Sequence, residues 1–235
     1  MGIYAQQTIE QYEAITTATI TTVLFKHHGL KNVWIRGALP LQPGQKRVAG
    51  PAFTLRFVPA REDLCTAAAW SAPISTRSAI EEMPANSIAV MAAGQNTDAG
   101  VLGDILCQRM KQRGVAAMLT DGVVRDVDAV RETGLSIWAQ GVAAPPAIAA
   151  LAFIGWQQPV GCGGVAIFPD DLIVADGDGA VVIPAALVDA VLEAAIAQEA
   201  LEDWIMSEVK NGVALPGLYP PNEDSMKRYR LQQSQ

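Results

Sequence analysis

Charged residues are scarce in this chain. They make up 17% of its 235 residues, whereas about 25% is usual for a soluble domain, so an unusual share of the surface is expected to be apolar or covered by another subunit. Acidic residues outnumber basic ones, and the formal net charge is −7. Nucleic acids and anionic membranes bind to basic surfaces, and the longest basic cluster is the short group Lys227, Arg228 and Arg230. We therefore expect neither kind of partner.

Histidine and cysteine are also few. The two histidines, His27 and His28, are adjacent at the end of an expected helix, so neither a histidine-based catalytic triad nor a histidine-rich transition-metal site is expected. The three cysteines, Cys65, Cys107 and Cys162, are widely spaced and form no CxxC pair. They indicate neither a disulfide framework nor a zinc site, and they fit a reducing cytoplasm.

Several sequence patterns are absent. No window of 18 residues is free of charged or polar breaks, and residues 1–13 lack a basic stretch followed by an apolar segment, so no membrane association is expected. The chain has no GxSxG, GxxxxGKS/T or HExxH motif, and no GxGxxG after a strand. Because no tandem repeat interrupts the pattern, we expect one domain over residues 1–235. Residues 213–235 would form an extended tail that is either disordered or laid across a neighbouring subunit.

The hydrophobic pattern predicts helices that alternate with strands. Helices are expected over 8–28 with a stop at Gly29, over 62–70, after a loop at 94–103 as far as residue 113, over 127–132 and over 185–211. Strands are expected over 47–58, 88–92, 115–120 and 137–139, with three short strands within 164–184. This order predicts an α/β fold with a parallel sheet covered on both faces, in which ligands bind beyond the carboxyl ends of the strands. Residues 176–179 are expected to form a hairpin turn, because the closing glutamate of a calcium loop is missing.

Acidic residues stand at two of the expected strand-to-helix junctions. Asp104 begins the helix after the strand 88–92, and Arg125 and Asp126 begin the helix after the next strand. In one interpretation the aspartates cap their helices and Arg125 is a surface partner of one of them. In the other, helix amides and Arg125 bind a small carboxylate, while the aspartates hold Mg²⁺ or Mn²⁺ directly or through water. Both interpretations use the same geometry.

At these residues the sequence resembles the RraA-like family, which contains class II 4-hydroxy-4-methyl-2-oxoglutarate/4-carboxy-4-hydroxy-2-oxoadipate aldolases and regulators of RNase E activity. The aldolase branch has an aspartate, twenty residues and then Arg-Asp, and Asp104 and Arg125-Asp126 reproduce that spacing. Further matches are residues 47–54 (RVAGPAFT), Asp121-Gly122 and residues 164–184. The resemblance covers roughly residues 14–190.

The resemblance implies a layered α/β sandwich of the phosphohistidine or swivelling-domain type, with flanking N- and C-terminal helices. It also implies a homotrimer or homohexamer with sites at subunit interfaces. The carboxylate of a small 2-oxo acid would be held at Gly103 by the backbone amides of Ile105 and Leu106, and Arg125 would bind its keto and carboxylate oxygens.

For the metal, the resemblance implies that Asp126 ligates Mg²⁺ or Mn²⁺ and that Asp104 orients a water in the metal shell. Arg125 and Asp104 would be the catalytic residues. The implied activity is that of a metal-dependent class II aldolase, which cleaves a 4-hydroxy-2-oxo acid to pyruvate and a second oxo compound. A cation and a guanidinium beside the enolate oxygen would stabilise its charge. Decarboxylation of oxaloacetate would be a side activity, because it forms the same enolate.

Two alternatives stay open. One alternative is a non-catalytic regulator of ribonuclease activity. The regulators generally lack the acidic metal ligand, so Asp126 favours an enzyme over a regulator. The other alternative is a subgroup that acts on another sugar-derived 2-oxo acid, by hydration or dehydration. It is indicated by departures from the family at 19–23, at 169–171 and in the tail from Leu215 onward. In some relatives an acidic residue of a neighbouring subunit completes the site, and the candidates for that residue are Glu193, Glu199, Glu202 and Glu208.

Overall fold

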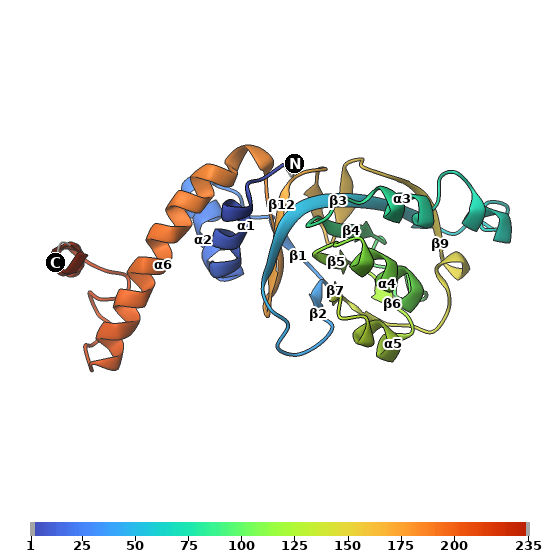
Figure 1. Ribbon diagram of the computed structural model, residues 1–235. Helices are drawn as coiled ribbons and strands as arrows, with labels where there is room; N and C mark the ends of the chain where they lie inside the picture. The colour runs from blue at the N-terminus through green and yellow to red at the C-terminus, as the bar shows by residue number, and fades with distance from the viewer. Residues whose placement is uncertain (1–2, 234–235) are drawn as a thin grey trace.

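The computed structural model describes residues 3–233, so residues 1–2 and 234–235 of the predicted domain and tail lie outside the described part. At the centre is a curled mixed sheet of nine strands (Figure 1), in the order β1-β13-β12-β3-β4-β5-β7-β2 with β9 paired to β3. These strands are β1 (Trp34–Ile35), β2 (Leu39–Pro40), β3 (Val48–Pro59), β4 (Ile88–Ala92), β5 (Ala117–Thr120), β7 (Ser136–Ala139), β9 (Leu151–Trp156), β12 (Leu172–Asp176) and β13 (Gly179–Ile183). Two smaller pairs consist of β6 (Val123–Val124) with β8 (Gly141–Val142) and of β10 (Val160–Cys162) with β11 (Val165–Ile167). The helices are α1 (Gln6–Ala14), α2 (Thr17–His28), α3 (Thr76–Glu82), α4 (Asp104–Gln112), α5 (Val127–Glu132), α6 (Val188–Lys210) and α7 (Glu223–Gln233).

The middle of the sheet is parallel, as the alternation of strands and helices predicts. Strands β3, β4, β5 and β7 run parallel to one another. The prediction of a wholly parallel sheet is wrong for the other strands, since β1, β2, β9, β12 and β13 pair antiparallel to their neighbours. A tight turn joins β12 to β13 and pairs Asp176 with Gly179, and so short a connection can only join antiparallel strands. This turn confirms the predicted hairpin.

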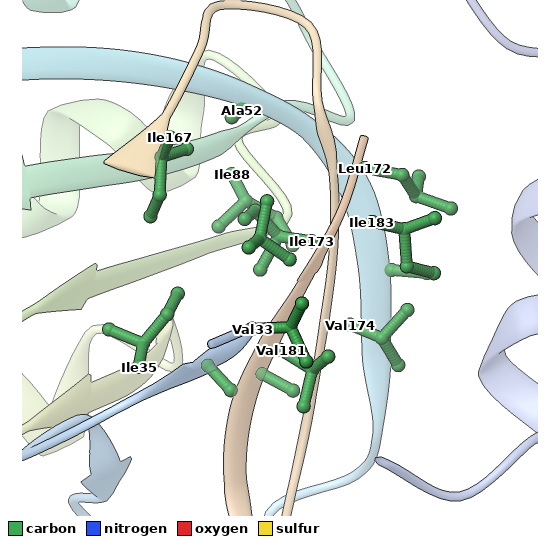
Figure 2. Packing of buried hydrophobic residues seen from close by; sticks show 14 of the residues in the cluster. Val33, Ile35, Ala52, Ile88, Ile167, Leu172, Ile173, Val174, Val181 and Ile183 are labelled. Carbon is green, nitrogen blue, oxygen red and sulfur yellow. The ribbon is translucent and has the colours of Figure 1, made fainter. Parts of the chain in front are cut away.

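The central strands are buried on both faces, and their alternating side chains enter two separate cores. In β4, Ile88 and Val90 belong to one core, whereas Ala89 and Met91 belong to the other. This alternation follows from the period of two along a strand. Helices α1 and α2 and the start of α6 cover the first core, and α3, α4 and α5 cover the second. Figure 2 shows part of the first core, with Ile88 of β4, Ile173 of β12 and Val181 of β13. The α/β class with flanking helices is confirmed.

The N-terminal segment forms two helices, so the prediction of one helix over 8–28 is wrong at its centre. Thr16 has an extended backbone with φ −71° and ψ 148°, and its side chain accepts a hydrogen bond from the amide of Thr19 at the start of α2. The amide and hydroxyl of Thr16 also donate to Glu199 of α6, at 3.0 and 3.1 Å. A side-chain cap and a tertiary contact therefore interrupt the helix. The predicted stop is confirmed, since Gly29 ends α2 with φ +70°.

Two further predictions about helices are wrong. Residues 62–70 contain no α-helix, and only a short 3₁₀ helix is present there (Ala67–Ser71). The connection that follows does contain a helix, α3, whose start is capped by Ser75 through a bond from the amide of Ser78. Short helices of this kind are decided by local caps and packing, which weak periodicity does not reveal.

The tail folds back on its own chain, so the expectation of disorder is wrong for residues 223–233. Helix α6 extends away from the sheet, and α7 lies near its outer end (Figure 1). The rings of Trp204 and Tyr229 lie 5.5 Å apart, and Arg228 of α7 forms an ion pair with Glu208, which is nearly buried. Within residues 3–233, no helix has both the length and the apolar character needed to cross a membrane.

Candidate functional site

The two aspartate-bearing junctions lie at the same edge of the sheet. Strands β4 and β5 are parallel neighbours, so the starts of α4 and α5 open on one side, as predicted. A pocket of about 610 Å³ lies there, and its lining includes every residue expected at the site: Gly103, Asp104, Ile105, Leu106, Arg125 and Asp126. The structure thus brings the six residues together, while the chemical role of each stays a prediction.

Glycine allows the two junctions to approach closely. A side-chain carbon at Gly103 would lie 2.6 Å from Oδ2 of Asp126, and one at Gly100 would lie 2.6 Å from the amide nitrogen of Arg125. Backbone bonds join the segments as well, because the amide of Arg125 donates to the carbonyl oxygen of Leu102 at 3.1 Å. The loop before α4 therefore places the start of that helix directly beside the Arg125-Asp126 pair.

Arg125 and Asp126 form an ion pair at the pocket. Arg125 donates from Nε to Oδ2 of Asp126 at 2.8 Å, and the two side chains are 34% and 41% exposed. Asp126 has a left-handed backbone with φ +53° and ψ 43°, and its side chain makes no capping bond to α5. Gly103 rather than Asp104 occupies the N-cap position of α4. Asp126 therefore occupies the N-cap position of α5, as the capping interpretation predicts, but it makes no capping bond, and for Asp104 that interpretation is wrong. The predicted pairing of Arg125 with one aspartate is confirmed.

The start of α4 offers free backbone donors. The first intrahelical bond runs from the amide of Cys107 to the carbonyl oxygen of Gly103, at 3.1 Å. The amides of Ile105 and Leu106 precede it, and they donate to no residue within the described part of the chain. Such amides carry the positive end of the helix dipole and bind carboxylates well. Ile105 itself is 78% exposed, so a ligand can reach this turn from solvent.

Asp121, which the sequence presents only as part of a motif, has a supporting role in the structure. It is 2% exposed and accepts three backbone bonds, from Ala93 at 2.7 Å, Gln95 at 3.2 Å and Gly163 at 3.0 Å. These bonds fix the beginning of the loop that leads to α4. The position of Asp121 directly after a buried strand was the sequence signal that could have pointed to this role. The role itself could not be predicted, because the amides that Asp121 binds come from segments distant in the sequence.

The two buried cysteines, Cys107 and Cys162, supply no reactive group to this site. Burial, with Asp104 nearby, raises the pKa of Cys107 to about 12. Burial also raises the pKa of Cys162 well above the ordinary value, and the negative charge of Asp121 adds to this rise. Because the thiolate is the reactive form of cysteine, both side chains are inert thiols at neutral pH.

Most of the rest of the pocket lining is apolar, apart from Ser75, Thr76 and Arg77 at the start of α3, and the sequence did not point to it. It comes from β3, from the connection that follows β3, and from β9, which no sequence pattern predicted. The larger apolar side chains are Phe57, Leu64, Ile74, Leu151, Phe153 and Ile154. These segments meet only through tertiary pairing of β9 with β3, which local sequence patterns do not encode.

The donor set suits a hard divalent cation. Carboxylate oxygens are available from Asp126 and Asp104, and Mg²⁺ is commonly held by one or two carboxylates together with several waters. The absence of a side chain at Gly103 leaves space beside Oδ2 of Asp126. Among residues 3–233 there is no cluster of three or more histidine, cysteine or acidic side chains, so the protein ligands of such a cation would be these one or two carboxylates.

Of the four glutamates that are candidates for completing a neighbouring site, Glu202 accepts a bond from Gln198 within α6, and two others contact other segments of their own chain. Glu199 accepts bonds from Thr16, and Glu208 pairs with Arg228. Each of these contacts supports the packing of a terminal helix onto α6.

Comparison with known proteins gives consistent results. A family model described as Aldolase/RraA matches residues 16–182. The chain is 32% identical over 195 residues to the "Putative 4-hydroxy-4-methyl-2-oxoglutarate aldolase" of Halalkalibacterium halodurans, covering 82% of this chain and 83% of that protein. It is 30% identical over 176 residues to Protein DlpA of Legionella pneumophila, covering 75% of this chain but only 28% of the longer DlpA.

Solved structures agree with the sequence relatives. An uncharacterized protein from Pseudomonas syringae has a TM-score of 0.81 and 27% identity, with 93% of this chain and 95% of that chain covered. Streptomyces coelicolor RraAS2, described as an unusual member of the RNase ES inhibitor RraA protein family, has a TM-score of 0.76 and 32% identity, with coverage of 86% and 96%. The chain therefore belongs to the RraA-like, or Aldolase/RraA, family.

Proposed function

We propose that this protein is a divalent-metal-dependent lyase that cleaves a 4-hydroxy-2-oxo acid to pyruvate and a second oxo compound. The observation that carries the proposal is the meeting of three elements in one pocket: the free amides of α4, the guanidinium of Arg125 and the carboxylate of Asp126. Relatives named as aldolases in several bacteria support the same reaction class.

In this proposal the 2-oxo acid binds through its charged end. Its carboxylate accepts bonds from the amides of Ile105 and Leu106, where the helix dipole favours an anion. Arg125 donates to the carboxylate and to the keto oxygen, since its planar fork suits two acceptors. Asp126 holds Mg²⁺ or Mn²⁺, and Asp104 orients a water in the metal shell. When bound, the cation supplies positive charge beside the keto oxygen.

The bond changes follow from this placement. The C4 hydroxyl would pass its proton, through the water that Asp104 orients, to the carboxylate of Asp104, which later returns it to C3. C4 becomes a carbonyl carbon as the C3–C4 bond breaks. The electron pair moves into the pyruvate fragment as an enolate, whose oxygen faces Arg125, and protonation at C3 gives pyruvate. A donor aimed at a developing oxyanion lowers the barrier because it is placed before the reaction begins. Oxaloacetate that loses CO₂ leaves the same enolate, so we propose decarboxylation as a second activity.

The assembly is also a proposal. Ile105 stands 78% exposed at the pocket edge, and the charge content is low, which supports a homotrimer or homohexamer that covers this edge. The three cysteines are free thiols, in keeping with a protein of the reducing cytoplasm.

The test is pyruvate release by metal-stripped protein. We expect 4-hydroxy-2-oxo acids and oxaloacetate to be turned over after Mg²⁺ or Mn²⁺ is restored, and turnover to stop when EDTA is added. No metal-dependent turnover of any of these substrates would contradict the lyase. The similarity to RraAS2 favours a second candidate, a non-catalytic regulator of a ribonuclease. That alternative predicts a catalytically silent protein that co-purifies with a ribonuclease.

A further inference from the structure

The pocket has room for more than the pyruvate fragment. Its volume of about 610 Å³ lies within the range of about 300–1,000 Å³ found for pockets that bind drug-sized molecules. The start of α4 and the Arg125-Asp126 pair form only one part of the lining. In the proposed reaction the remaining part must accommodate the group attached to C4 of the substrate, which leaves with the second oxo compound.

The charged side chains of the lining cancel one another. Among the described residues that line the pocket, the charged ones are Arg77, Asp104, Arg125 and Asp126. Because two are positive and two are negative, a bound divalent cation would leave two positive charges in the pocket. A substrate with two carboxylates balances that charge, whereas a substrate with one carboxylate leaves one positive charge over. Charge complementarity therefore favours the doubly charged substrate.

Arg77 is the cation of this lining that lies outside the proposed pyruvate site. It is an exposed residue in the first turn of α3, and the hydroxyl of Ser75 fixes the start of that helix by accepting a bond from the amide of Ser78 at 3.3 Å. Farther along α3, Glu81 accepts bonds from Nε and Nη2 of Arg109 of α4, at 2.8 and 2.7 Å. The helix that carries Arg77 is therefore tied to the helix whose free amides face the pocket.

The lining outside the pyruvate site is otherwise mostly apolar. Phe57, Ile74 and Phe153 belong to it, and the rings of Phe57 and Phe153 meet edge to face with centroids 5.2 Å apart. A carboxylate placed against such side chains loses water, which is strongly unfavourable unless the ion is paired. A guanidinium is the strongest partner for a carboxylate, and the pair is stronger where water is excluded. A second carboxylate is therefore expected to pair with Arg77.

Arg77 already has an interaction of its own. Interactions of exposed charged side chains contribute little free energy, whereas a carboxylate that accepts two parallel bonds from a guanidinium forms a stronger pair. A substrate carboxylate can therefore replace the existing interaction.

We propose that Arg77 is a specificity-determining residue that binds a carboxylate on C4 of the substrate. The proposal rests on the proposed function, because it assigns the pyruvate half of the substrate to Arg125 and the α4 amides. It predicts that the second product is itself a 2-oxo acid, since C4 becomes a carbonyl carbon beside the carboxylate that Arg77 holds.

Two substrates that carry either a carboxylate or a methyl group on C4 provide the test. 4-Hydroxy-2-oxoglutarate would release glyoxylate, and 4-hydroxy-2-oxopentanoate would release acetaldehyde, each together with pyruvate. We expect kcat/KM to be at least about tenfold higher for the diacid, and Arg77→Gln should lower the ratio of the two kcat/KM values about tenfold. Arg77→Lys should lower it less, because lysine keeps the charge but not the planar fork.

The loss in Arg77→Gln should come mainly from a higher KM for the diacid. Arg77 would hold a carboxylate that does not react, so its bonds are equally strong before and during the reaction, and such binding changes KM rather than kcat. A structural defect at the site would instead lower kcat for both substrates.

Arg61→Gln is the matched control. Arg61 is an exposed arginine three residues before Leu64 of the lining, it pairs with Asp63, and it is not among the described lining residues. Its selectivity ratio should stay within about twofold of the wild-type ratio, and an equal loss of selectivity in Arg61→Gln would overturn the assignment of Arg77. Thermal unfolding identifies any variant that fails to fold, and Arg77→Lys keeps the test valid if Arg77→Gln does not fold.

Exchange of the pyruvate methyl protons in D₂O, followed by NMR, involves no C4 substituent and so tests the proposed function alone. If wild type catalyses metal-dependent exchange but cleaves both substrates equally well, or if Arg77→Gln keeps the wild-type ratio within about twofold, the role of Arg77 is overturned while the proposed function stands. If neither exchange nor cleavage occurs, both proposals are overturned.

Discussion

Replacing Gly103 with alanine perturbs the proposed site at one atom. The added Cβ would lie 2.6 Å from Oδ2 of Asp126 and 3.3 Å from Cγ of Arg125. The backbone of Gly103 has φ −128° and ψ −165°, which alanine also adopts, so the substitution introduces crowding without backbone strain. The prediction is that Gly103→Ala impairs turnover while the protein stays folded.

The size of the effect follows from the distances. Carbon and oxygen atoms in close contact are usually about 3.3 Å or more apart, so the carboxylate of Asp126 must move by about 0.7 Å. This displacement approaches the misplacement of about 1 Å that costs roughly 100-fold in rate. We therefore expect kcat/KM to fall about 10- to 100-fold. Stability should change by no more than about 1 kcal/mol, the usual scale of an N-cap substitution.

The assay is pyruvate release at saturating Mg²⁺, together with thermal unfolding. Gly161→Ala is the matched control, because a side chain at Gly161 would meet nothing within 4 Å, and it should retain wild-type turnover. Full activity of Gly103→Ala would refute the idea that the contact between the α4 loop and Asp126 sets the geometry of the site. Equal loss in both variants would refute it too.

Three other predictions concern the site and its support. Arg125→Ala and Asp126→Ala should abolish turnover while the protein stays folded, because partly exposed residues at the sheet edge add little to the core and alanine in the left-handed backbone of Asp126 costs only about 1–2 kcal/mol; unfolded variants would contradict this. Asp121→Ala leaves the buried amides of Ala93 and Gly163 without a partner at about 1–3 kcal/mol each, and urea denaturation should show the loss, whereas Asp121→Asn should lose less. Burial alone would raise the pKa of Asp176, but hydrogen bonds, led by those from Thr17, outweigh it and lower the pKa. The stability that this carboxylate provides is thus complete above its unfolded pKa of about 4 and is lost as pH falls below it. The difference in melting temperature between wild type and Asp176→Asn should therefore shrink on acidification, and a constant difference would argue against this effect.

The central part of the fold was predictable because its information is local. The apolar run 88–92, the helix stop at Gly29 and the helix that ends at residue 113 depend on residues near in sequence, and the structure contains the expected β4, α2 and α4. The break at Thr16 was not predictable, because it depends partly on Glu199 far along the chain. The antiparallel strand β9 was not predicted either, because it forms by pairing with β3, which is far away in the sequence.

The candidate site likewise has a part that was predictable from the sequence and a part that was not. The spacing of Asp104 and Arg125-Asp126 located one end of the pocket, because both positions follow neighbouring parallel strands. The aromatic part of the lining was not predicted, since Phe57 and Phe153 meet only through the pairing of β3 with β9. The supporting role of Asp121 was not predictable, because a sequence does not show which distant amides a buried carboxylate binds.

The most direct test of the proposed site is a crystal structure of the protein with Mg²⁺ and pyruvate. We predict density for the cation at the carboxylate of Asp126, with pyruvate between it and Arg125 and the pyruvate carboxylate at the amides of Ile105 and Leu106. Pyruvate bound elsewhere, or a cation that avoids Asp126 when pyruvate is present, would contradict the proposed site.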